Sequence, residues 1–191
     1  YYTRAKLYAA QGIELEHPGF MELTEGPAQP YEAFLAQVEG ESVSLLFWMG
    51  YNWGASINLS LDDPAAIVDL PKVIATMKRV VELDESTYHG SAHTVLAVAK
   101  AGLPKALGGD PDGAKEHFER ARKLTDNRYL MTDVLYARFY HARANPDQAA
   151  FEEMLEAVID AESDLYPEQR LANELAKKRA AYWIEQVNSL F

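Results

Sequence analysis

The chain has 191 residues, contains no cysteine and carries a formal net charge of −11. These properties exclude disulfides and cysteine-based metal sites, and they argue against nucleic acid as a partner, because phosphate binding requires clustered lysine and arginine. With 48% hydrophobic residues the chain can bury a substantial core. No apolar stretch reaches the roughly 18 residues that a membrane span needs.

The first half of the chain shows the apolar spacing of amphipathic helices, interrupted by proline and glycine. Helices are expected over 2–15, 31–38, 42–59, 71–83 and 86–101. A connection between the first two is rich in proline and glycine, and one short helical turn is expected around 20–23. No segment alternates with the period of two that a β-strand requires.

In the second half of the chain, each predicted helix begins at or just after a proline. Asp110-Pro111-Asp112 places a capping aspartate, a proline at the first helical position and a second acid at the positive end of the helix dipole. The predicted helix runs to about Thr125. Asn145-Pro146-Asp147 repeats the device for a helix ending near Ala161, and a last helix follows Pro167 and continues to about Leu190.

A helix led by proline recurs along the chain at a spacing of about forty residues. The prolines are Pro30, Pro71, Pro111 and Pro146. Each is followed by an apolar triad with steps of four and three: Tyr31/Leu35/Val38, Val73/Met77/Val80, Ala114/Phe118/Ala121 and Phe151/Leu155/Val158. The pattern predicts an all-α fold, a tetratricopeptide-like solenoid of about four helix pairs plus a C-terminal helix, in a single domain over 1–191. Periodicity alone also allows HEAT-like pairs.

Complete catalytic and metal motifs are absent from the sequence. His89 and His93 have the spacing of a zinc site, but the metalloprotease pattern fails because no glutamate follows His89, and buried or capping histidines are the favoured interpretation. The Asp110–Gly113 segment resembles the start of a calcium loop, yet Ala121 stands where the loop needs glutamate. We therefore expect no enzyme activity, no metal and no cofactor.

Aromatic and polar residues within the predicted first helices of the pairs suggest a ligand site. Arg138 lies among aromatic residues, and a cation there requires a partner or a ligand anion. The candidate ligand-binding residues are Trp48, Asn52, Trp53, Asn58, His93, Tyr136, Arg138, Tyr140 and Asn173. Core packing for the aromatics, and helix-to-helix hydrogen bonds for the polar residues, are the alternatives.

Several runs resemble the TRAP-transporter T component (TatT). The runs include Trp48-x-Gly50-x-x-Trp53-Gly54-Ala55, Gly90-Ser91-Ala92-His93, Leu107-Gly108-Gly109-Asp110-Pro111, Tyr136-Ala137-Arg138-Phe139-Tyr140 and Arg170-Leu171-Ala172-Asn173. The resemblance covers about residues 1–190. It implies a non-enzymatic periplasmic lipoprotein that binds or channels a small hydrophobic organic acid and docks a TRAP periplasmic substrate-binding protein.

The chain departs from the lipoprotein pattern in one respect, because it shows neither a signal peptide nor a lipobox cysteine. Tyr1 opens directly into a helical pattern, as in a mature or trimmed chain, so periplasmic anchoring follows from the resemblance alone. Exposed aromatic surface and unpaired solenoid ends suit a homo-oligomer, such as a trimer. The alternative function is a tetratricopeptide scaffold for protein–protein interaction that binds a peptide segment.

Overall fold

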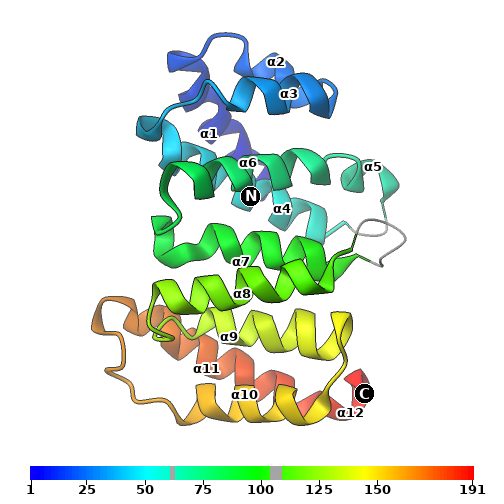
Figure 1. Ribbon diagram of the computed structural model, residues 1–191, viewed down its shortest axis with the longest axis vertical. Coiled ribbons are helices and arrows are strands. Elements are labelled where there is room, and N and C mark those ends of the chain that lie inside the picture. Colours follow the sequence, from blue (N-terminus) through cyan, green and yellow to red (C-terminus); the bar gives the residue numbers. More distant parts are fainter. Residues whose placement is uncertain (61–62, 104–108) are drawn as a thin grey trace. The chain divides into compact units, whose positions relative to one another are not determined.

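A computed structural model describes residues 1–60, 63–103 and 109–191 (Figure 1). Helices make up about 80% of these residues, and the described ranges hold no strand. The predicted all-α class is confirmed. The chain forms two compact units, unit 1 over Tyr1–Tyr88 and unit 2 over His89–Phe191. Whether the whole chain acts as one domain stays a prediction.

Unit 1 is built around the aromatic helix α4. Its elements are α1 (Tyr2–Glu16), α2 (Phe20–Glu25), α3 (Ala28–Leu35), η1 (Gly40–Ser42), α4 (Val43–Asn58), α5 (Pro64–Ile67) and α6 (Leu70–Asp84). Helix α4 packs against both α1 and α6, while α3 packs on α6. Helix α4 carries no charged residue, which allows it to pack against neighbours on two sides.

The two triads predicted for unit 1 are buried, as their spacing indicates. Tyr31 and Met77 are fully inaccessible, and the Tyr31 hydroxyl bonds to Thr76 Oγ1 over 2.6 Å. Gly50 marks the closest approach of α4 to α6. A Cβ atom there would lie 3.0 Å from Thr76 Cγ2 and 2.8 Å from Met77 Cε, so α4 needs a residue without a side chain at this crossing.

Unit 2 continues from α7, whose first two residues belong to unit 1. Its elements are α7 (Thr87–Gly102), α8 (Pro111–Leu124), α9 (Met131–Tyr136), η3 (Ala137–Ala144), α10 (Gln148–Asp160), η4 (Pro167–Gln169), α11 (Arg170–Glu185) and α12 (Val187–Leu190). Helix α10 packs against α11, α9 and η3, and α8 packs against α9.

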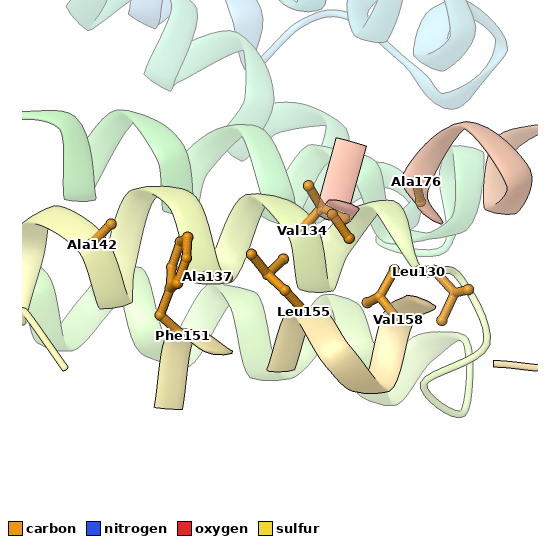
Figure 2. Close-up of a cluster of buried hydrophobic side chains, with 9 residues drawn as sticks. Leu130, Val134, Ala137, Ala142, Phe151, Leu155, Val158 and Ala176 are labelled. Carbon is orange, nitrogen blue, oxygen red and sulfur yellow. The ribbon is translucent and has the colours of Figure 1, made fainter. Parts of the chain in front are cut away.

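The core of unit 2 is formed by the same kind of triad. Phe151, Leu155 and Val158 of α10 are buried against side chains of α9 and η3, including Val134 and Ala137 (Figure 2). In α8 the triad places Phe118 between two alanines, and all three side chains are inaccessible to solvent. The apolar triad with steps of four and three thus predicts burial correctly in both units.

Element η3 is a π-helix of eight residues, which the sequence analysis did not anticipate. A π-helix donates hydrogen bonds from residue i to residue i−5, so each turn is wider than an α-helical turn. The wide geometry continues past the end of the element, where Asn145 N donates to Tyr140 O over 2.9 Å. The predicted site residues Arg138 and Tyr140 both belong to this segment.

The predicted start of α8 is confirmed, whereas the repeated Asn145-Pro146-Asp147 device was wrong, because Asp147 rather than Asn145 caps α10 and Pro146 lies before the helix. Asp110 Oδ1 accepts a hydrogen bond from Gly113 N, and Asp147 Oδ1 accepts one from Ala150 N. Lys100 Nζ donates to Asp110 Oδ2 over 2.6 Å. The hydrogen bonds from Lys100 and Gly113 hold the pKa of the Asp110 carboxyl below its usual value.

Some predicted boundaries were wrong. Helix α3 begins at Ala28, so Pro30 lies within its first turn rather than before it, and Val38 falls beyond its end at Leu35. The predicted last helix is divided at Gln186 into α11 and α12. Leu107 and Gly108, which begin the run that ends at Pro111, lie outside the described residues. The arrangement of the pairs as a tetratricopeptide-like solenoid stays a prediction.

Candidate functional site

Arg138 on η3 is a half-buried cation whose Nη1 atom is buried without a hydrogen-bond partner among the described residues. Its guanidinium carbon lies 4.5 Å from the ring centre of Trp183 on α11 and 5.9 Å from that of Phe139. These contacts are cation–π contacts, which cover the guanidinium without neutralising it. No carboxylate of the described chain forms an ion pair with Arg138.

The electrostatic surroundings of Arg138 are unfavourable for an isolated cation. Burial lowers the pKa of its guanidinium, and the positive charge of Arg143 lowers that pKa further. A buried charged group normally has a partner, because removing a charge from water without compensation is costly. The geometry therefore suits a bound anion at Arg138.

Four further buried side-chain atoms lack a hydrogen bond to the described residues, and all lie in unit 2. Arg122 Nε and Asp133 Oδ1 are nevertheless ion-paired over 2.6 Å, and Glu174 Oε1 lies 3.9 Å from Lys177 Nζ. The fourth atom, His141 Nδ1, belongs to η3 like Arg138. The two buried atoms that lack both a hydrogen bond and an ion pair thus lie on one π-helical turn.

Tyr136, Tyr140 and His141 form an aromatic cluster beside Arg138 in sequence. Tyr136 stacks on Phe118 at 4.7 Å with an interplanar angle of 10°, and on His141 at 5.1 Å with an angle of 26°. Burial raises the pKa of Tyr136 to about 12, and Glu119 contributes in the same direction. Burial also lowers the pKa of His141, which favours a neutral imidazole.

Tyr136 and Tyr140 pack in the core, as the alternative to ligand binding predicts, because both rings are buried in a cluster with Phe118. The hydrogen-bond alternative describes Asn173, whose Oδ1 accepts from Leu130 N while its Nδ2 donates to Arg128 O. Asn173 thus fastens the start of α9 to α11. Its amide is occupied within unit 2.

His93 is buried on α7, and its Nδ1 lies 2.8 Å from Nδ1 of His117 on α8. His89 lies apart from this pair, with its Nδ1 3.0 Å from the Tyr166 hydroxyl and its ring stacked on Tyr129. The part of the chain that is described contains no group of three or more metal-ligating side chains.

The remaining predicted residues lie on α4 in unit 1. Trp53 is buried, and Lys6 Nζ lies 3.5 Å from its ring centre. Asn52 is buried and donates from Nδ2 to Trp48 O over 2.6 Å, which is a bond within the helix. Asn58 is exposed at the last position of α4. Trp48 is partly exposed and donates from Nε1 to the Tyr88 hydroxyl.

The predicted ligand-binding residues are therefore distributed over the two units, and whether they line one site stays a prediction. Sequence reasoning missed Trp183 and Arg143, which set the surroundings of Arg138. For Trp183 a pattern was available, because Asn173, Ala176 and Ala180 precede it on α11 at helical spacing and all three are buried. For His141 no pattern was available, because the π-helical register changes which residues share a face.

The family model for the TRAP transporter T-component matches residues 1–191, the whole chain. The chain belongs to this family. The match agrees with the resemblance seen in the sequence, and the family is one of transporter components.

This T-component is also similar to an uncharacterized protein of Treponema pallidum (strain Nichols). The two are 25% identical over 191 residues, which is 100% of this chain. The chain spans 59% of the length of that relative. The T-component family is associated with the periplasm. Within the described ranges, no helix is both long and apolar enough to cross a membrane.

Proposed function

We propose that this T-component binds a small organic acid with an apolar body during TRAP transport. The observation that carries the proposal is the buried Arg138 Nη1, which has no hydrogen-bond partner in the described chain. A carboxylate would satisfy this atom by a charge-assisted hydrogen bond. The adjacent Trp183 ring supplies apolar surface for the body of the ligand.

The proposed role also includes docking to the periplasmic substrate-binding protein of the transporter. Membership of the T-component family supports this partner. A lipid anchor on the full-length precursor would keep the protein at the membrane surface, as the family resemblance implies. No catalytic step is part of the proposal. The alternative, a peptide-binding scaffold, would instead bind an extended segment, and this binding would not require Arg138.

The test compares octanoate with octanol as probes, because the two share an apolar body and differ in the carboxylate. Isothermal titration should detect octanoate and not octanol. Arg138→Leu should reduce octanoate affinity at least tenfold, in keeping with the roughly 1.5–3 kcal/mol of a charge-assisted hydrogen bond. Circular dichroism should show unchanged helix content.

Arg170→Leu is the matched control, because Arg170 is an exposed arginine of unit 2 and has no contact with Trp183 in the described structure. This variant should bind octanoate as the wild type does. Equal binding of octanol and octanoate, or undiminished octanoate binding by Arg138→Leu, would show that Arg138 does not hold the acid. Capture of the substrate-binding protein by an immobilised T-component tests the docking role separately.

A further inference from the structure

Three partly exposed aromatic rings lie in contact with one another on unit 1, whereas Tyr136 and Tyr140 of unit 2 are buried. Trp48 and Tyr51 of α4 are 44% and 41% exposed, and Tyr88 at the start of α7 is 38% exposed. Phe47 is buried beneath them, with its ring centre 5.9 Å from that of Tyr51 and 4.6 Å from that of Tyr88. We refer to Trp48, Tyr51 and Tyr88 as the aromatic trio.

The rings of the trio are inclined to one another rather than laid flat. The ring planes of Tyr51 and Tyr88 make angles of 80° and 62° with that of Trp48, at centroid distances of 5.8 and 5.1 Å. Trp48 Nε1 donates to the Tyr88 hydroxyl over 2.8 Å. Because this bond occupies the indole N–H, Trp48 offers a ligand its π-surface rather than a hydrogen-bond donor.

Tyr88 is held in a strained backbone conformation. Its φ is +47°, and His89 and Gly90 follow with φ of +62° and +70°, so three consecutive residues are left-handed. A residue with a Cβ adopts this conformation only at an energetic cost. Strained residues of this kind concentrate at binding and active sites, where the strain fixes a side chain in place. Here the fixed side chain is an exposed ring of the trio.

The net charge of unit 1 as a whole favours a cation over an anion. Unit 1 contains thirteen acidic residues and five basic ones, whereas unit 2 contains sixteen and thirteen. Three of the five basic residues of unit 1 are engaged elsewhere. Lys6 lies on the Trp53 ring, Lys72 Nζ donates to Thr24 O, and Arg79 donates to Val38 O. Helix α4 itself has no basic residue.

From these observations we infer that the aromatic trio binds a methylated ammonium group, such as that of choline. The negative faces of aromatic rings attract such cations, and recognition by two or three inclined rings is the usual arrangement. A quaternary ammonium needs no hydrogen bond, which agrees with the occupied indole N–H of Trp48. This site is independent of the acid site proposed at Arg138, since the two sites share no residue.

The test titrates the full chain with choline and with its uncharged carbon analogue, in which carbon replaces the ammonium nitrogen. Choline should bind, and the analogue should bind at least tenfold more weakly. Trp48→Leu and Tyr51→Leu should each weaken choline binding at least fivefold. Tyr182→Leu is the matched control, because Tyr182 is an exposed aromatic of unit 2, and it should leave choline binding unchanged.

Two variants are used because loss of the Trp48 bond to Tyr88 could disturb the left-handed turn, whereas Tyr51 makes no such bond in the described structure. Equal binding of choline and its carbon analogue would show that the trio does not recognise the positive charge, and it would overturn the inference. Full choline binding by both variants would do the same. Arg138→Leu should leave choline binding unchanged, so failure of the acid site and of the cation site are distinguishable.

Discussion

Unit 1 and unit 2 both bury apolar triads of the same spacing, but they differ in whether their buried cation has hydrogen-bond acceptors. In unit 1 the buried cation Lys72 is fully partnered, because its Nζ donates to Thr24 O over 2.9 Å and to Asp69 Oδ1 over 3.0 Å. In unit 2 the cation Arg138 keeps a buried Nη1 that no described residue satisfies. The triad thus determines how the helices of each unit pack, whereas the buried polar atoms differ between the two units.

The exposed surfaces of the two units differ as well. Unit 1 presents the aromatic trio within a strongly acidic unit, whereas unit 2 covers its cation with Trp183 and buries Tyr136. If both proposals hold, a single T-component carries a cation site and an anion site built on the same helical framework. The following predictions test whether the two units are as separate as this contrast suggests.

The largest expected effect is the loss of a core side chain. Phe118→Ala in unit 2 and Met77→Ala in unit 1 each remove a fully buried side chain, at a cost of about 3–5 and 2–5 kcal/mol in the free energy of unfolding. Urea unfolding followed by circular dichroism measures the cost. Hydrogen exchange should locate the lost protection in the substituted unit. A uniform loss over both units would instead mean that they unfold together.

A smaller effect is expected where α4 crosses α6 in unit 1. Gly50→Ala would bring a Cβ within 3.0 Å of Thr76 Cγ2, and overpacking of this kind costs about 1–3 kcal/mol. The Met77 side chain is flexible at its end, which favours the lower value. Gly40→Ala is the control, because a Cβ there meets nothing within 4 Å. An equal change in melting temperature for both variants would contradict the close crossing.

The smallest effect is a pH dependence in unit 2. Because the pKa of Asp110 is lowered in the folded state, its stabilising contribution is complete above the ordinary aspartate pKa of about 4 and is lost as pH falls through the folded-state value. Asp110→Asn keeps a capping side chain and removes the charge. The melting temperatures of wild type and variant should differ at pH 7 and converge below about pH 4.

Asp112→Asn serves as the control for this measurement, since Asp112 makes no hydrogen bond or ion pair in the described structure although it shares the first turn of α8. Its melting temperature should follow that of the wild type more closely across the same range. A difference for Asp110→Asn that persists unchanged at pH 3 would exclude the charge of Asp110 as its cause.

Much of the fold was predictable from the sequence, because burial follows a short local pattern. The triads, the capping aspartate Asp110 and most helix bounds are set by neighbours within one or two turns. The candidate site was predictable only in part. Arg138 stood out as a cation among aromatics, yet its contact with Trp183 joins residues 45 positions apart. Local patterns contain no information on such pairs.

The left-handed turn and the π-helix were missed for a different physical reason. Tyr88 is not a residue that favours positive φ, so its residue type argues against the conformation that it adopts. The π-helical register of η3 is likewise invisible to a search that assumes 3.6 residues per turn. Neither feature follows from the spacing or type of the residues that form it.

The π-helix η3 also has a consequence for how the family can vary in length. Because each residue of an α-helix turns the chain by about 100°, deleting one residue from Ala137–Ala144 would restore the narrower turn and rotate one side of the helix against the other. Because Ala137 and Ala142 of η3 lie in the same core cluster as the α10 triad, the rotation would disturb the packing of unit 2 as well as the position of Arg138. The number of residues between Met131 and Gln148 is therefore tied to the core of unit 2 and to its buried cation together.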